Sequence, residues 1–368
     1  MKRGFLLWNK NELPLEEFAS RISKAKSFMA SKKLDAVAIY GDANQSSNLS
    51  YLTNFFPYAD TGIFILPLSG APMLFTTHAY RNMPWFRKIT WVEDIVCTNS
   101  MGEECLNYLK SIDLPEKKIG LIHTRAFPYP IYQIFQDQLS SDFIDVTDDY
   151  ECLRSVKSEY ELSFVKKASD IANKSFKKLN HILRPGISGY EIAAEIELTA
   201  RGDGAEDIFC YIQPDNDQNG LTLPTTQEVK HFCSIELSVE YKGYWIKMGR
   251  TLLANESAAP VKESLEKFSK IYHEVTDSIC SGQKTLEFYQ GLKDRLTRIE
   301  DIKELQIQFD LGLEPYWTTH LNKNIDKYFE KNMILYLKTV ATFQNDLNVL
   351  LVNTYAIQEE KPLQLSTF

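Results

Sequence analysis

Residues 234–253, SIELSVEYKGYWIKMGRTLL, decide how this sequence folds, because they read as two strands joined by a tight turn. The pair Lys242-Gly243 separates two runs rich in β-branched and aromatic residues, which is typical of a two-residue hairpin loop. In that register Ser238 lies opposite Lys247, and Glu236 is a diagonal neighbour of Lys247 on the same face. The pattern therefore predicts that a carboxylate and an ammonium share one face of a pocket.

The composition is that of an ordinary globular protein. The chain has 368 residues, of which 44% are hydrophobic and 24% charged, which is enough for two domains with large cores. A net charge of −8 argues against nucleic acid or an anionic membrane as a partner, because an acidic surface offers neither of them attraction. No apolar run is long enough for a signal peptide or a bilayer span, so we expect a cytoplasmic protein.

The six cysteines are scattered and form no CxxC pair. This spacing suggests neither a disulfide framework nor a zinc knuckle. We expect reduced and mostly buried thiols.

The first part of the chain alternates helical and strand patterns. Apolar residues recur at helical spacing over residues 15–32, and the strand LDAVAIYG follows. Further β-rich runs and a second helix-strand alternation lead to KKIGLIHT. The alternation predicts an α/β sandwich over residues 1–152.

A second domain is predicted over residues 153–368. Its first 50 residues read as two helices separated by RPGIS, residues 184–188, with Ser188 placed to cap the second helix. The β-rich run of residues 234–253 lies beyond them.

The hairpin resembles the metal-binding hairpin of the creatinase, prolidase, aminopeptidase P and methionine aminopeptidase superfamily, which has the pita-bread fold. The resemblance rests on an acidic residue followed by GYW and then RT, on Tyr51-Leu52-Thr53-Asn54-Phe55 in place of the usual YLTGF, and on Lys157-Ser158 before a helix. It implies an α/β (α+β) protein with an N-terminal creatinase-like domain and a C-terminal pita-bread domain. In the metallopeptidase members an Asp stands at the place of Glu236 and another at the place of Lys247.

Three C-terminal segments extend the resemblance: ELQIQFDLGLEPYW, EKNMILYLKTVA and NVLLVNTYAIQEEKPLQLS. Aligned on the family's motifs, Phe309, or a neighbour one residue away, stands where the metal-binding His would be. Lys338 and Val352 stand where the two metal-binding Glu residues would be. Divalent ions need deprotonated oxygens and an imidazole, whereas this set offers two ammonium groups and two apolar side chains. The resemblance therefore predicts a site with no metal and no cofactor, in which only Glu236 keeps the chemistry of a ligand.

The two lysines allow two interpretations. They could replace the missing cations by pairing with Glu236, or they could bind an anionic substrate group and act as acid, base or nucleophile. The expected catalytic residues are Glu236, Lys247, Lys338 and His320. The expected substrate-binding residues are Tyr244, Asp310, Tyr316, Asn353 and Phe55.

By resemblance, the predicted function is that of a metal-independent creatinase-like enzyme. It would act on a C–N bond of a small, carboxylate-bearing, amino-acid-like molecule, and the resemblance also implies a homodimer. The alternative is a catalytically inactive pseudo-peptidase that serves as a binding or scaffold protein. A true Xaa-Pro metallopeptidase fits the fold but not the ligand positions.

Overall fold

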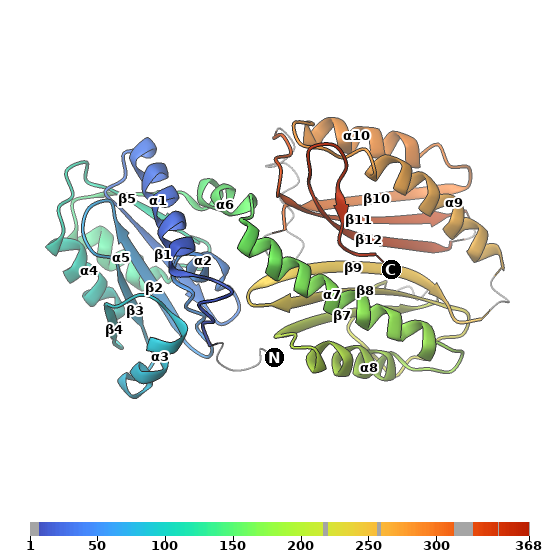
Figure 1. Cartoon of the computed structure of the whole chain (residues 1–368), viewed down its shortest axis with the longest axis horizontal. Helices are drawn as coiled ribbons and strands as arrows, with labels where there is room; N and C mark the ends of the chain where they lie inside the picture. The colour runs from blue at the N-terminus through green and yellow to red at the C-terminus, as the bar shows by residue number, and fades with distance from the viewer. Residues whose placement is uncertain (1–6, 216–219, 256–258, 313–326, 345, 368) are drawn as a thin grey trace. The chain divides into compact units, whose positions relative to one another are not determined.

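The computed structural model describes residues 7–215, 220–255, 259–312, 327–344 and 346–367 of the chain. The chain divides into two compact units, residues 2–154 and residues 155–368 (Figure 1). Within the described ranges, no helix is long and apolar enough to cross a membrane.

The N-terminal unit is a sheet with helices on both faces. Its strands lie in the order β4-β3-β2-β1-β5-β6, with β1 antiparallel to β2 and parallel to β5. The predicted first helix is present with the expected bounds. The elements are α1 (Leu15–Lys32), β1 (Ala36–Asp42), α2 (Ser47–Thr53), β2 (Thr61–Pro67), β3 (Met73–Thr76), η1 (Tyr80–Asn82), α3 (Met83–Ile89), β4 (Ile95–Cys97), α4 (Met101–Ser111), β5 (Lys118–Ile122), α5 (Tyr129–Gln138), β6 (Asp142–Asp145) and α6 (Thr147–Ser155).

Strand β1 shows why both faces of this sheet are covered. Val37 and Ile39 are buried in one apolar cluster, together with side chains of α1, α2 and α3. Ala36 and Ala38 are buried in a second cluster, together with side chains of α4 and α5. An apolar run without alternation is what a strand covered on both sides requires.

The C-terminal unit is a larger sheet with two pairs of helices. Its strands follow the order β10-β11-β12-β9-β8-β7, and β13 pairs with β12. In Figure 1, α7 and α8 lie beside β7 to β9, and α9 and α10 lie beside β10 to β12. The elements are α7 (Glu159–Ile182), α8 (Gly189–Gly202), β7 (Asp207–Pro214), β8 (Phe232–Tyr241), β9 (Tyr244–Leu253), α9 (Ala259–Thr276), α10 (Thr285–Leu296), β10 (Ile302–Asp310), β11 (Ile334–Phe343), β12 (Asn348–Ala356) and β13 (Leu363–Gln364).

Capping boxes begin the first two helices of this unit. Ser188 accepts a hydrogen bond from the Glu191 amide, and the Glu191 carboxylate accepts one from the Ser188 amide. Ser158 and Glu161 make the same reciprocal pair at the start of α7. The predicted cap at Ser188 is confirmed, since these bonds satisfy amides that have no partner inside the helix.

Alternation in β8 separates a core face from a polar one. Ile235, Leu237 and Val239 are buried in the cluster that includes α7 and α8. Glu236 and Ser238 therefore point to the opposite face of the sheet. We call this the polar face and define it by Glu236, Lys247 and Lys338.

Candidate functional site

The predicted hairpin positions the first two residues of the site. β8 and β9 pair through a loop of Lys242 and Gly243, whose φ angles are 50° and 83°. Positive φ at both loop positions is the geometry of a type I′ turn, which suits the twist of a hairpin. Ser238 lies opposite Lys247, as predicted. Glu236 lies opposite Gly249 and is therefore a diagonal neighbour of Lys247 on the polar face.

A row of register partners crosses the polar face from β8 to β11. Glu236 lies opposite Gly249, Gly249 opposite Val352, and Val352 opposite Lys338. The Lys338 Nζ lies 2.5 Å from the Glu236 Oε2. A Cβ at Gly249 would already meet the Val352 Cγ2 at 2.9 Å. The ion pair therefore spans β9 and β12 and passes over Gly249, which has no side chain.

The two partners of this ion pair differ in their access to water. The Glu236 side chain is 3% exposed, and the Lys338 side chain is 17% exposed. A carboxylate buried to this degree needs a paired cation and hydrogen bonds. The ammonium is consequently the more accessible of the two charges.

Lys247 lies deeper in the sheet. Its side chain is 0% exposed, and its Nζ lies 4.8 Å from the centroid of the Tyr336 ring, which is a cation–π distance. The Tyr336 hydroxyl donates to the Trp245 carbonyl oxygen at 2.7 Å. The structure brings the Lys338 ammonium to the Glu236 carboxylate, as one interpretation of the two lysines expects, and keeps Lys247 as a diagonal neighbour of Glu236.

The donor set does not fit the divalent ions of the metallopeptidases that the hairpin resembles. Within the described ranges, no group of three or more His, Cys, Asp or Glu side chains is arranged to hold a metal. A lysine ammonium lies against the one carboxylate kept at a ligand position, Glu236. Both observations disfavour a cluster of oxygen and imidazole ligands at this place. Metal independence itself stays a prediction.

The position expected for the lost His, Phe309 or a neighbour one residue away, lies on β10. Phe309 lies opposite Leu337, and its side chain is buried in the apolar cluster of α9 and α10. Gln308, one residue earlier, lies opposite Lys338 and shares its face. At this point of β10 the polar face therefore carries an amide.

Two predicted binding residues of this unit point to the helices. The Tyr244 hydroxyl donates to the Glu161 Oε1 of α7 at 3.0 Å. Asn353 is buried, and its Oδ1 accepts from Arg250 Nη2 at 2.6 Å and from the Ser366 hydroxyl at 2.8 Å. Because Asn353 follows Val352 on β12, it takes the opposite face. Tyr244 thus ties β9 to α7, and Asn353 ties β12 to Arg250 and Ser366 on the face away from Glu236.

A third predicted binding residue, Phe55, is fully buried in the core of the N-terminal unit. Its ring lies 5.5 Å from that of Phe86, so it is part of the core and does not face a ligand. Asp310 keeps a place near the site, because it is buried opposite Tyr336 on the polar face. Tyr316 and His320 lie outside the described residues.

The structure adds residues that sequence reasoning missed. Tyr211 of β7 lies opposite Glu236, and burial together with the smaller effect of the Glu236 charge raises the pKa of its hydroxyl. Gln308 and Tyr336 also face the lysines. Tyr211 and Gln308 follow from the pairing of β7 with β8 and of β10 with β11. The sequence alone does not show these pairings.

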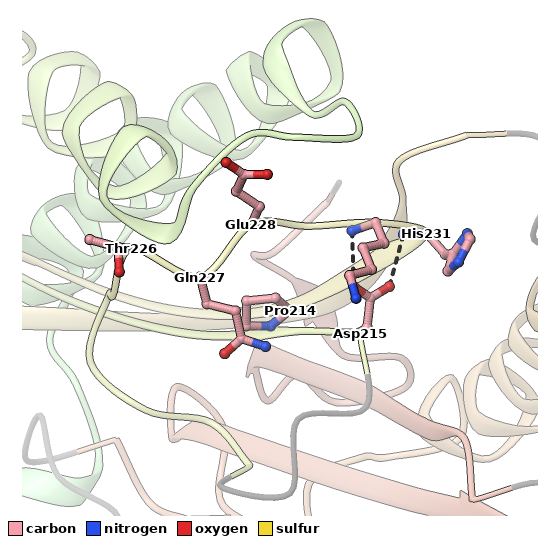
Figure 2. A pocket seen from close by; sticks show the side chains of 7 residues that line it. Pro214, Asp215, Thr226, Gln227, Glu228 and His231 are labelled. Atoms are coloured by element: carbon pink, nitrogen blue, oxygen red, sulfur yellow. Dashed lines mark hydrogen bonds between the residues drawn. The ribbon is translucent and has the colours of Figure 1, made fainter.

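An open recess of about 530 Å³ lies at the end of β7 (Figure 2). The Asp215 carboxylate accepts hydrogen bonds from the backbone amides of Lys230, His231 and Phe232. His231 is exposed at its rim, which agrees with a strand-edge position. The recess is lined by Pro214, Asp215, Thr226, Gln227, Glu228, Lys230 and His231.

Comparisons with known proteins agree with this architecture. Residues 21–156 match the creatinase/prolidase N-terminal domain, and residues 163–358 match metallopeptidase family M24. The chain is 22% identical over 268 residues to the uncharacterized peptidase YqhT of Bacillus subtilis, and the match covers 71% of each protein.

Solved structures share the fold. An Xaa-Pro dipeptidase from Bacillus anthracis has a TM-score of 0.82 at 19% identity, and the match covers 95% of this chain and 98% of that one. The prolidase from Pyrococcus horikoshii OT3 has a TM-score of 0.77 at 18% identity, over 95% and 98% of the two chains. The predicted fold class and superfamily are confirmed.

The predicted function is contradicted by the same comparisons. The relatives are named peptidases, and the similar structures are an Xaa-Pro dipeptidase and prolidases. These names point to peptidases, so the assignment to a metal-independent creatinase-like enzyme was wrong.

Proposed function

The chain belongs to metallopeptidase family M24, and from this membership we propose that the polar face of its C-terminal domain binds short peptides. The observation that carries the proposal is the Lys338–Glu236 pair, which places a partly accessible ammonium on this face. Gln308 beside it and Tyr211 across from Glu236 add groups that can form hydrogen bonds with peptide groups. A few polar groups at fixed positions are what orients a ligand in a protein site.

Titration calorimetry with a small panel tests the binding. The panel holds Xaa-Pro dipeptides, an Ala-Ala dipeptide, a tripeptide and free amino acids. Wild-type protein should bind at least one peptide, and Lys338→Met should weaken that binding by about tenfold or more, because a charge-assisted hydrogen bond contributes roughly 1.5–3 kcal/mol. Lys303→Met is the matched control, since Lys303 is an exposed lysine of β10 that pairs with Asp346.

Lys338→Arg guards against a folding defect, because it keeps the positive charge beside Glu236. It should retain peptide binding in part. The proposal fails if no peptide in the panel binds, or if Lys338→Met binds as tightly as wild type while remaining folded.

Hydrolysis of Xaa-Pro peptides is the second candidate function. It is favoured by the name and the fold of the Bacillus anthracis dipeptidase. It is opposed by the poor fit of the described residues to divalent ions, since they include no group of three or more His, Cys, Asp or Glu side chains that could hold a metal. Proline release from an Xaa-Pro dipeptide, measured with and without added Mn²⁺ and alongside elemental analysis, separates the two: metal-stimulated turnover supports hydrolysis, and binding without turnover supports recognition alone.

We also propose that the protein is a cytoplasmic homodimer without a nucleic-acid partner. The net charge of −8 supports the last point, and the resemblance to creatinase-like proteins supports the dimer. Light scattering at micromolar concentration should give twice the chain mass of 42.4 kDa. A monomer mass would contradict the dimer without affecting the peptide proposal.

A further inference from the structure

A buried His–Asp pair lies at one end of the N-terminal sheet. His78 follows β3 and Asp60 precedes β2, and the antiparallel pairing of these strands brings the two residues to the same end. The His78 Nδ1 lies 2.8 Å from the Asp60 Oδ2. The His78 side chain is 5% exposed and the Asp60 side chain 37%, so the imidazole is buried and its carboxylate partner reaches water.

Aromatic rings surround the rest of the imidazole. The His78 ring centroid lies 5.5 Å from that of Phe86, 6.0 Å from that of Trp85 and 6.3 Å from that of Phe55. Within the described part of the chain, the buried His78 Nε2 has no hydrogen-bond partner. Asp60 is the ionisable group that acts on the imidazole there, and the contacts from α3 are aromatic.

These contacts fix the form of the neutral ring. An ionised carboxylate accepts hydrogen bonds and cannot donate them, so Nδ1 of the neutral ring carries the hydrogen and Nε2 is left as an acceptor. A neutral acceptor without a partner is tolerable among aromatic rings, whereas a protonated Nε2 would add a donor and a charge at the same place. Burial lowers the pKa of His78, and the smaller opposing effect of the Asp60 charge does not restore it.

His78 also holds the segment that joins α2 to β2. Phe55 and Asp60, near the two ends of residues 54–60, both contact the imidazole. Asn54 adds a hydrogen bond from its Nδ2 to the Ile89 carbonyl oxygen of α3 at 2.8 Å. The imidazole thus contacts both this segment and α3, beside the direct contacts of Asn54 with Ile89 and of Phe55 with Phe86.

We propose that His78 is a pH-sensitive contact, which holds residues 54–60 against α3 when neutral and loosens them when protonated. This inference is independent of the peptide-binding proposal. A pKa that is lower in the closed state than the ordinary 6.5 means that protonation favours the open state. The closed state is therefore fully stable above about pH 6.5 and loses stability as the pH falls through the lowered pKa.

Hydrogen–deuterium exchange of full-length protein at pH 7.5 and pH 5.0 tests the proposal, with rates corrected for intrinsic pH dependence. Exchange of residues 54–60 should accelerate at the lower pH, by at most about tenfold per pH unit, because one pKa unit corresponds to a tenfold change in an equilibrium. His78→Gln should remove this response, since an amide does not titrate in this range. His123→Gln, a half-buried histidine of the same domain, should keep it.

Asp60→Asn is a second test of the His78–Asp60 contact, for the case that His78→Gln does not fold. Without its counter-charge the imidazole should protonate at a lower pH, so the midpoint of the response should move down. The proposal is overturned if wild-type exchange in residues 54–60 is the same at both pH values, if His78→Gln keeps the response, or if the Asp60→Asn midpoint does not fall.

Discussion

Replacing either partner of the Lys338–Glu236 pair tests the geometry of the polar face. Lys338→Met removes the ammonium that lies 2.5 Å from the Glu236 carboxylate, whose side chain is 3% exposed. Removing one member of a buried pair typically costs about 3–5 kcal/mol of unfolding free energy. We expect the upper part of this range for Lys338→Met and a smaller loss for Glu236→Gln, which leaves behind the more exposed ammonium.

The double variant Glu236→Gln/Lys338→Met should lose less stability than the two single variants together. Residues in direct contact commonly show a coupling of about 0.5–3 kcal/mol, and neither buried charge is left without the other in the double variant. Urea unfolding followed by circular dichroism measures each step of this cycle. The matched control is the cycle of Lys303 of β10 and Asp346 of the connection between β11 and β12, an exposed pair at 2.9 Å, for which we expect no measurable coupling.

Two outcomes would refute this reasoning. Additive effects of the two single changes would mean that the side chains do not meet. An equal loss for Glu236→Gln and Lys338→Met would mean that the difference in burial does not set the cost.

Three further predictions concern other parts of the chain. Ser158→Ala and Ser188→Ala should each lower stability by about 1 kcal/mol in thermal melts, because each removes a helix cap; unchanged melts would mean that the caps are not formed. Gly249→Ala should cost about 1–3 kcal/mol, since its Cβ would meet the Ile235 carbonyl oxygen at 2.9 Å, whereas Gly291→Ala in α10 meets nothing within 4 Å and should stabilise by up to roughly 1 kcal/mol. A thiol reagent should modify exposed Cys152 first and reach Cys210 only on unfolding, because Cys210 is buried and burial raises its pKa to about 12; rapid modification of Cys210 in the native protein would contradict its burial.

The hairpin register could be predicted because it depends on local information. A two-residue loop and strict alternation fix which residues face one another, and Ser238 indeed lies opposite Lys247. The same alternation could have excluded Tyr244, which is three residues from Lys247 and so belongs to the other face. Asn353 could have been excluded in the same way, since it directly follows Val352.

The contact between Lys338 and Glu236 was expected only from the family resemblance, because local patterns do not contain it. Lys338 reaches Glu236 across β9 and β12, and the order of these strands in the sheet is not written in any local pattern. The same limit applies to Phe309 and Gln308. A shift of one residue in the pairing of β10 with β11 would exchange the faces on which their side chains lie. The burial of Phe55 depends on α3, which lies well beyond it in the chain.

The bridge between β8 and β11 also bears on the order of folding. β9 and β12 form two register pairs, whereas β8 and β9 form ten, so the junction between the two halves of the sheet rests on few backbone contacts. Glu236 and Lys338 are 102 residues apart in the sequence. Contacts between such distant residues form slowly during folding, because the chain must first close a long loop. Their contact should therefore form after the rate-limiting step, and its loss should speed unfolding while leaving the refolding rate nearly unchanged.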